Sequence, residues 1–130
     1  MNNIKIILLL FFIVVCSTGK AQKSYIYLAP LDSSTPYSIS CGTFLDSFGG
    51  SVKKIKLNKN KKDRISFLIK SLDKINIKPY FNVRYMGEFY TKKQKFTFCG
   101  DEASICVNGI NYKTSKDLYT YIRELDKDNL

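Results

Sequence analysis

The chain has 130 residues, of which 21 are lysine or arginine and 11 are aspartate or glutamate, so its formal net charge is +10. It contains no histidine, which removes the commonest general base, the commonest metal ligand and any Ser-His or Cys-His nucleophile pair. We therefore expect a basic protein that is not an enzyme, with no catalytic residues, no cofactor and no metal ion.

The N-terminal segment has the pattern of a signal peptide. Lys5 precedes eleven apolar residues, Ile6 to Cys16, a length that fits the apolar region of an export signal. A bilayer span needs about twenty apolar residues, so this run is too short to be an anchor. The small residues Gly19 and Ala21 predict cleavage after Ala21. Residues 22–130 then form a single small domain.

Lipid attachment at Cys16 is the alternative, because a bacterial lipoprotein carries its acyl chains on a cysteine directly after such a run. Val15 precedes this cysteine and is β-branched, whereas lipoprotein signals place a small residue there. We expect an exported protein, periplasmic or extracellular, with anchoring at Cys16 as the less favoured alternative.

The exported part keeps 19 basic and 11 acidic residues, because only Lys5 and Lys20 are lost with residues 1–21. Its net charge near +8 favours contact with anionic surfaces. Its aromatic content is high, so tyrosine and phenylalanine rings should supply much of the core.

Two short β-rich stretches follow in chain order. Residues 24–30 (SYIYLAP) and 37–41 (YSISC) are separated by turn-forming residues, which predicts a hairpin or adjacent strands. Residues 42–51 contain three glycines and no clear period. We expect a flexible loop there, with Phe44, Leu45 or Phe48 packed down onto the domain.

The next segment, SVKKIKLNKNKKDR, carries six lysines and an arginine. Lys53, Ile55 and Leu57 alternate with two further lysines, which predicts a strand with one solvated lysine face. A helix over about residues 63–76 is predicted from its apolar stripe, with Asp63 as N-cap and an end before Pro79.

From Tyr80 to Met86 the period becomes two, which predicts a central strand. Residues 95–99, 104–107 and 110–113 then predict a three-strand meander, with a type I′ turn at Asn108-Gly109. That turn pairs Val107 with Ile110. A four-residue loop at 100–103 would further pair Phe98 with Ile105.

The last predicted element is a helix over about residues 115–125, opened by a capping box of Thr114 and Asp117 and followed by a frayed tail. The fold class is α+β: a small, mostly antiparallel sheet with one inserted helix and one C-terminal helix packed on one face.

Three cysteines remain after export, and their odd number predicts one disulfide and one leftover thiol. Cys99 and Cys106 lie diagonally on one face of the predicted meander, which a disulfide would span only with backbone adjustment. Cys41 pairing with either of them is about equally supported. No second cysteine pair completes a zinc site.

The lysine segment admits three interpretations. Nucleic-acid binding is disfavoured because the run has no aromatic residue and the protein is expected outside the cytoplasm. Protection of an edge strand from pairing is the simplest interpretation. Docking on anionic lipid or envelope polysaccharide is the functional one, and its candidates are Lys53, Lys54, Lys56, Lys59, Lys61, Lys62 and Arg64.

We therefore expect an exported binding protein of the bacterial cell envelope that contacts another protein, as inhibitors and immunity proteins do. Its candidate contact residues are Phe44, Leu45 and Phe48 in the glycine-containing loop. A basic adaptor docking through residues 53–64 is the alternative, and a small exported enzyme is a third.

Overall fold

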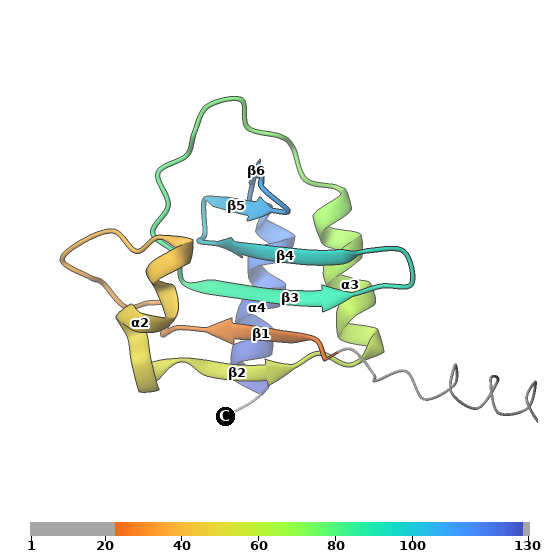
Figure 1. Cartoon of the computed structure of the whole chain (residues 1–130), viewed down its shortest axis with the longest axis horizontal. Coiled ribbons are helices and arrows are strands. Elements are labelled where there is room, and N and C mark those ends of the chain that lie inside the picture. The colour runs from red at the N-terminus through yellow and green to blue at the C-terminus, as the bar shows by residue number, and fades with distance from the viewer. Residues whose placement is uncertain (1–22, 129–130) are drawn as a thin grey trace, which may run out of the picture.

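The computed structural model describes residues 23–128 (Figure 1). The predictions for the N-terminal segment, including the signal peptide, cleavage after Ala21 and lipid attachment at Cys16, lie outside the described residues. Among the described residues, no helix combines the length and apolarity that crossing a membrane requires.

Six antiparallel strands form one sheet in the order β2-β1-β3-β4-β5-β6. This arrangement confirms the predicted α+β class. The strands in chain order are β1 (Tyr25–Leu28), β2 (Lys53–Lys56), β3 (Tyr85–Tyr90), β4 (Lys95–Gly100), β5 (Ser104–Val107) and β6 (Ile110–Lys113).

Two long helices, α3 (Lys59–Lys70) and α4 (Lys116–Asp128), cover one face of this sheet (Figure 1). Their apolar stripes pack on the inward-facing strand residues to form the main core. Phe89 stacks on Phe96 with ring centroids 4.7 Å apart. Burial of these aromatic and aliphatic side chains is the principal stabilisation of the domain.

A smaller core lies on the other face of the sheet. The chain between β1 and β2 contains two 3₁₀ turns, Cys41–Thr43 and Gly49–Ser51, on either side of the short helix α2 (Phe44–Phe48). This segment is therefore helical, and the prediction of an irregular loop over 42–51 was wrong. Its buried residues Ala29, Ile39 and Phe44 pack with Val83 and Cys99 in a second hydrophobic cluster.

The inserted helix starts and ends earlier than predicted. Its N-cap is Asn58, whose side-chain oxygen accepts a hydrogen bond from the Lys61 amide at 2.9 Å, and not Asp63. Lys59, Lys61 and Lys62 are therefore in the first helical turn rather than in a loop. Beyond Lys70 the chain becomes extended, because residues 73–75 pair with the outer edge of β6.

The C-terminal helix is capped by Ser115, whose hydroxyl accepts the Leu118 amide at 3.1 Å. The predicted capping box of Thr114 and Asp117 was wrong, because the Thr114 hydroxyl donates to the Asp101 carbonyl instead. The helix also continues to Asp128, so residues 126–128 are not frayed.

Two strand predictions also need correction. Residues 37–41 form no strand, and β1 pairs with β2 and β3 instead. The central strand β3 starts at Tyr85 rather than at Tyr80. Residues 82 and 83 bond to the neighbouring loops described below, while the Arg84 amide donates to the Gly100 carbonyl of β4 at 2.9 Å.

The meander is confirmed from the Asn108-Gly109 turn, where both residues have positive φ angles of 49° and 81° and Val107 pairs with Ile110. Phe98 pairs with Val107, however, and not with Ile105. The reason is that the pairing continues to Gly100 with Ile105 and the Asp101 amide donates to the Ser104 carbonyl at 2.9 Å, so the turn is two residues shorter than predicted. The resulting two-residue shift keeps every side chain on its predicted face.

Candidate functional site

Three loops meet at the end of the sheet where β1 and β4 finish (Figure 1). We call the surface formed by residues 30–40, 77–84 and 101–103 the loop rim. The Val83 amide donates to the Ile39 carbonyl at 2.9 Å, and the Ile39 amide donates to the Asn82 side-chain oxygen at 3.1 Å. The Asn82 amide donates to an Asp101 carboxylate oxygen at 2.9 Å. These bonds join all three loops.

The buried side chain of Arg84 forms hydrogen bonds that hold the loop rim in place. Its side chain is buried, with only 6% of the residue exposed. Nε and Nη2 both donate to the Ser33 carbonyl, at 3.3 and 3.1 Å, while Nη1 donates to the Asn82 side-chain oxygen at 2.9 Å. The guanidinium also lies 5.2 Å from the ring centroid of Phe48. A buried charge with these partners fixes the backbone of the first loop.

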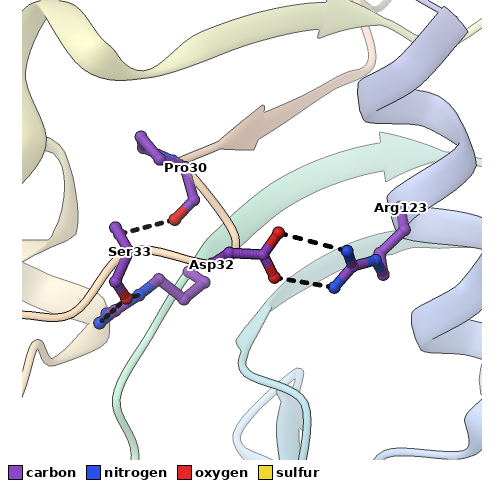
Figure 2. A network of polar contacts seen from close by, with 5 residues as sticks. Pro30, Asp32, Ser33 and Arg123 are labelled. Carbon is purple, nitrogen blue, oxygen red and sulfur yellow. Dashed lines mark hydrogen bonds and ion pairs between the residues drawn. The ribbon is translucent and has the colours of Figure 1, made fainter.

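A second attachment holds the same loop to α4 (Figure 2). Asp32 accepts two hydrogen bonds from Arg123, at 3.0 and 3.3 Å, in a bidentate pair. This pair raises the pKa of the Arg123 guanidinium. The neighbouring Ser33 hydroxyl donates to the Pro30 carbonyl at 2.6 Å, which closes a tight turn. The loop is thus held between Arg84 on one side and Arg123 on the other.

Three large apolar side chains of the loop rim are exposed. Tyr37 is 63% exposed, Ile77 is 79% exposed and Tyr80 is 82% exposed. The Tyr80 hydroxyl forms a hydrogen bond with the Ser38 hydroxyl, so the two tyrosines belong to adjoining parts of the rim. Exposed rings on an immobilised backbone are the arrangement found at protein-binding hot spots.

A disulfide joins Cys41 to Cys99, with a Cα–Cα distance of 5.9 Å. It fastens the start of the α2 segment to β4, next to the loop rim. Cys106 is a half-buried free thiol and lies directly opposite Cys99 in the ladder. Of the alternatives left open by the sequence, the structure therefore has the pairing with Cys41.

The predicted partner-loop residues have different positions. Phe44 is fully buried in the minor core, so it is packed onto the domain and its side chain is not exposed for a contact. Phe48 is half-buried against Phe44 and Arg84. Leu45 is exposed and is the one of the three that remains available for a contact.

The predicted lysine site does not form one surface. Lys53 lies on the helix-covered face and forms a salt bridge with Asp126 at 2.8 Å. Lys54 and Lys56 are exposed on the edge strand, with the Lys54 ammonium 4.0 Å from the Tyr25 ring centroid. The remaining members, Lys59, Lys61, Lys62 and Arg64, lie on the first half of α3.

Titratable groups are scattered over the described residues. Burial raises the pKa of the Tyr85 phenol, which donates to the Asp101 carbonyl at 2.9 Å beneath the loop rim. A hollow of about 700 Å³ lies beside the start of α4 and mixes acidic with basic side chains. Within residues 23–128, no group of three or more cysteine, aspartate or glutamate side chains is placed to hold a metal ion.

No known protein family matches this chain, and comparison with curated proteins and with solved structures found no significant match.

Sequence reasoning missed the loop rim because Tyr37 and Tyr80 were each assigned to a strand. One signal in the sequence marks both residues, since each directly follows a proline, in STPY and IKPY. Proline favours loop conformations at its own position and the one before it. A Pro-Tyr pair in an otherwise β-rich stretch is thus compatible with an exposed ring on a loop. Nothing in the sequence around Arg84 predicted that its side chain would be buried.

Proposed function

We propose that this protein is an exported, non-enzymatic binding protein of the bacterial cell envelope whose loop rim docks on another protein, in the manner of inhibitors and immunity proteins. The observation that carries the proposal is the exposure of Tyr37, Ile77 and Tyr80 on loops held by hydrogen bonds, a buried arginine and a neighbouring disulfide.

Preorganisation supports a docking role. Association costs free energy when loops and side chains must be ordered, so a surface that is already ordered binds more tightly for the same contact area. Tyrosine is enriched at interface hot spots because it offers a large rigid ring with a polar tip. Open, water-exposed loops with such rings suit a partner of protein size better than a small enclosed ligand.

The test is retention of a partner by immobilised protein from the envelope fraction and medium of the producing cell, at low salt and at about 0.3 M salt. Wild type is compared with Tyr37→Ala/Tyr80→Ala and with a control, Ile110→Ser, which removes an exposed apolar side chain outside the loop rim. Since all three side chains are exposed, both variants should fold.

We expect one protein that is retained by wild type and control at both salt concentrations and lost with the rim variant. Two hot-spot tyrosines should together weaken the Kd by about 100-fold or more. Equal retention by the rim variant and the control would overturn the proposal, as would retention that disappears at the higher salt.

A further inference from the structure

A second surface with an exposed aromatic ring lies on the outward side of α3. Phe67 is 65% exposed, and the Arg64 guanidinium lies 5.8 Å from its ring centroid. Three positions further along the helix, on the same face, is the exposed Lys70. Phe67 therefore lies outside the buried stripe of α3, which contains Ile65, Leu68 and Ile69.

The turn between β3 and β4 adds two cations to this surface. A hollow of about 450 Å³ lies between α3 and the turn of residues 91–94, and its lining includes Phe67, Lys70, Lys92 and Lys93. Its only acidic member is Asp63. Within residues 23–128, Arg64, Lys70, Lys92 and Lys93 form no salt bridge. We call Arg64, Phe67, Lys70, Lys92 and Lys93 the basic-aromatic patch.

The basic-aromatic patch lies at one end of the sheet, near the start of the described chain. The turn of residues 91–94 lies at the end of the sheet opposite the loop rim (Figure 1). The described chain also begins there, because the Ser24 hydroxyl accepts the Tyr90 amide at 3.2 Å at the end of β3. The N-terminal end of β1 is therefore on the patch side of the domain.

We infer that the basic-aromatic patch docks on an anionic phospholipid bilayer. Phenylalanine has no polar atom on its side chain, so its ring can enter the boundary between head groups and acyl chains, while the surrounding cations remain at the phosphates. The charge is complementary, since the Phe67 ring and three of the cations line one hollow and the fourth cation, Arg64, lies beside the ring. Docking at this end leaves the loop rim facing away from the membrane.

Vesicle sedimentation tests the inference with the whole protein as it is recovered from the cell. Vesicles of phosphatidylglycerol and phosphatidylcholine are compared with vesicles of phosphatidylcholine alone. The patch variants are Phe67→Ser and Lys70→Gln/Lys92→Gln/Lys93→Gln. The charge-matched control is Lys113→Gln/Lys116→Gln/Lys127→Gln, which removes three exposed lysines away from the patch. All variants share the same N-terminal segment, so any contribution of that segment to vesicle binding cancels when the variants are compared.

Each lysine near an anionic surface contributes roughly a five-fold factor to partitioning, so the patch variant should lose about 100-fold in affinity for anionic vesicles. Phe67→Ser should also weaken binding, and the control should lose far less. Equal losses in the patch variant and the control would reduce the effect to net charge and overturn the inference. Equal binding of wild type to both kinds of vesicle would also overturn it. Tighter binding of wild type to an acidic polypeptide than to anionic vesicles would overturn it as well.

Discussion

At the scale of single residues, Arg84 has the largest role in shaping the loop rim. It is a buried cation whose partners are carbonyl, amide and hydroxyl oxygens of the rim itself. A charge in this position is stabilised only while those oxygens surround it, so the guanidinium and the loop conformation depend on each other.

Replacing Arg84 with methionine keeps much of the side-chain volume but removes all of these donors. We expect the free energy of unfolding to fall by about 3 kcal/mol, because the Ser33 carbonyl loses both of its Arg84 donors. Urea denaturation measures the change. The same substitution at the exposed Lys127 should cost less than about 0.5 kcal/mol, and equal effects at both positions would contradict the anchoring role.

The second prediction at this scale concerns pH. Burial raises the pKa of the Tyr85 phenol, so the folded protein holds this proton to a higher pH than the unfolded chain does. Above about pH 10 the unfolded chain releases the proton, and the free energy of unfolding falls by up to about 1.4 kcal/mol per pH unit. Tyr85→Phe should cost about 1 kcal/mol at pH 8 but show a shallower decline up to pH 11. Parallel declines in the two proteins would be evidence against this.

At the scale of elements, α3 begins with an electrostatic conflict. Lys59, Lys61 and Lys62 lie in its first turn, where no acidic residue is present to offset the positive end of the helix dipole. The Asn58 cap and the buried stripe of the helix outweigh this cost.

Replacing Lys61 with glutamate places an acidic side chain three residues after the Asn58 cap. The change completes a capping box and complements the dipole, so we expect about 1 kcal/mol of added stability. Lys70→Glu, in the last turn of the same helix, should have the opposite sign and a cost of about 0.5 kcal/mol. Thermal unfolding of the two variants compares them directly, and shifts of the same sign would show that net charge dominates.

The disulfide sets the stability of the α2 segment. Cys41 and Cys99 are 58 residues apart in sequence, so their bond restricts the unfolded chain strongly and contributes about 4 kcal/mol on the chain-entropy estimate. Cys41→Ala/Cys99→Ala should lose most of this amount in urea denaturation, whereas Cys106→Ala should lose about 1 kcal/mol or less. Similar losses in the two variants would mean that Cys106 belongs to the bond, because a bond of Cys106 to either Cys41 or Cys99 is broken in both.

Which elements could be predicted depended on how local their signals are. The meander β4–β6 was predictable because period-two alternation and the Asn108-Gly109 turn are both local. The start of α3 was missed because a lysine-rich first helical turn and a solvated loop have the same composition. Residues 37–41 have β-forming side chains, but Ile39 bonds to residues 82 and 83 across the rim instead of joining the ladder. That contact is tertiary and leaves no periodic pattern.

At the scale of the whole molecule, the sheet separates two surfaces of different chemistry. The loop rim at one end presents tyrosine and isoleucine side chains, while the basic-aromatic patch at the other presents four cations around Phe67. The charge of the chain predicted that a basic surface exists. Of its residues only Arg64 was predicted, because Lys92 and Lys93 are distant in sequence from α3 and only the fold brings them together.

The most direct test of the loop rim as a protein-binding site is site-specific photocrosslinking in the producing cell. Tyr80 is replaced by a photoreactive benzoyl-phenylalanine, and Ile110, an exposed residue outside the loop rim, is replaced in the same way as the control. We predict one discrete protein adduct from position 80 that is absent from position 110 and is abolished by Tyr37→Ala. No adduct at position 80, or the same set of adducts from both positions, would contradict the assignment of the rim as the binding surface.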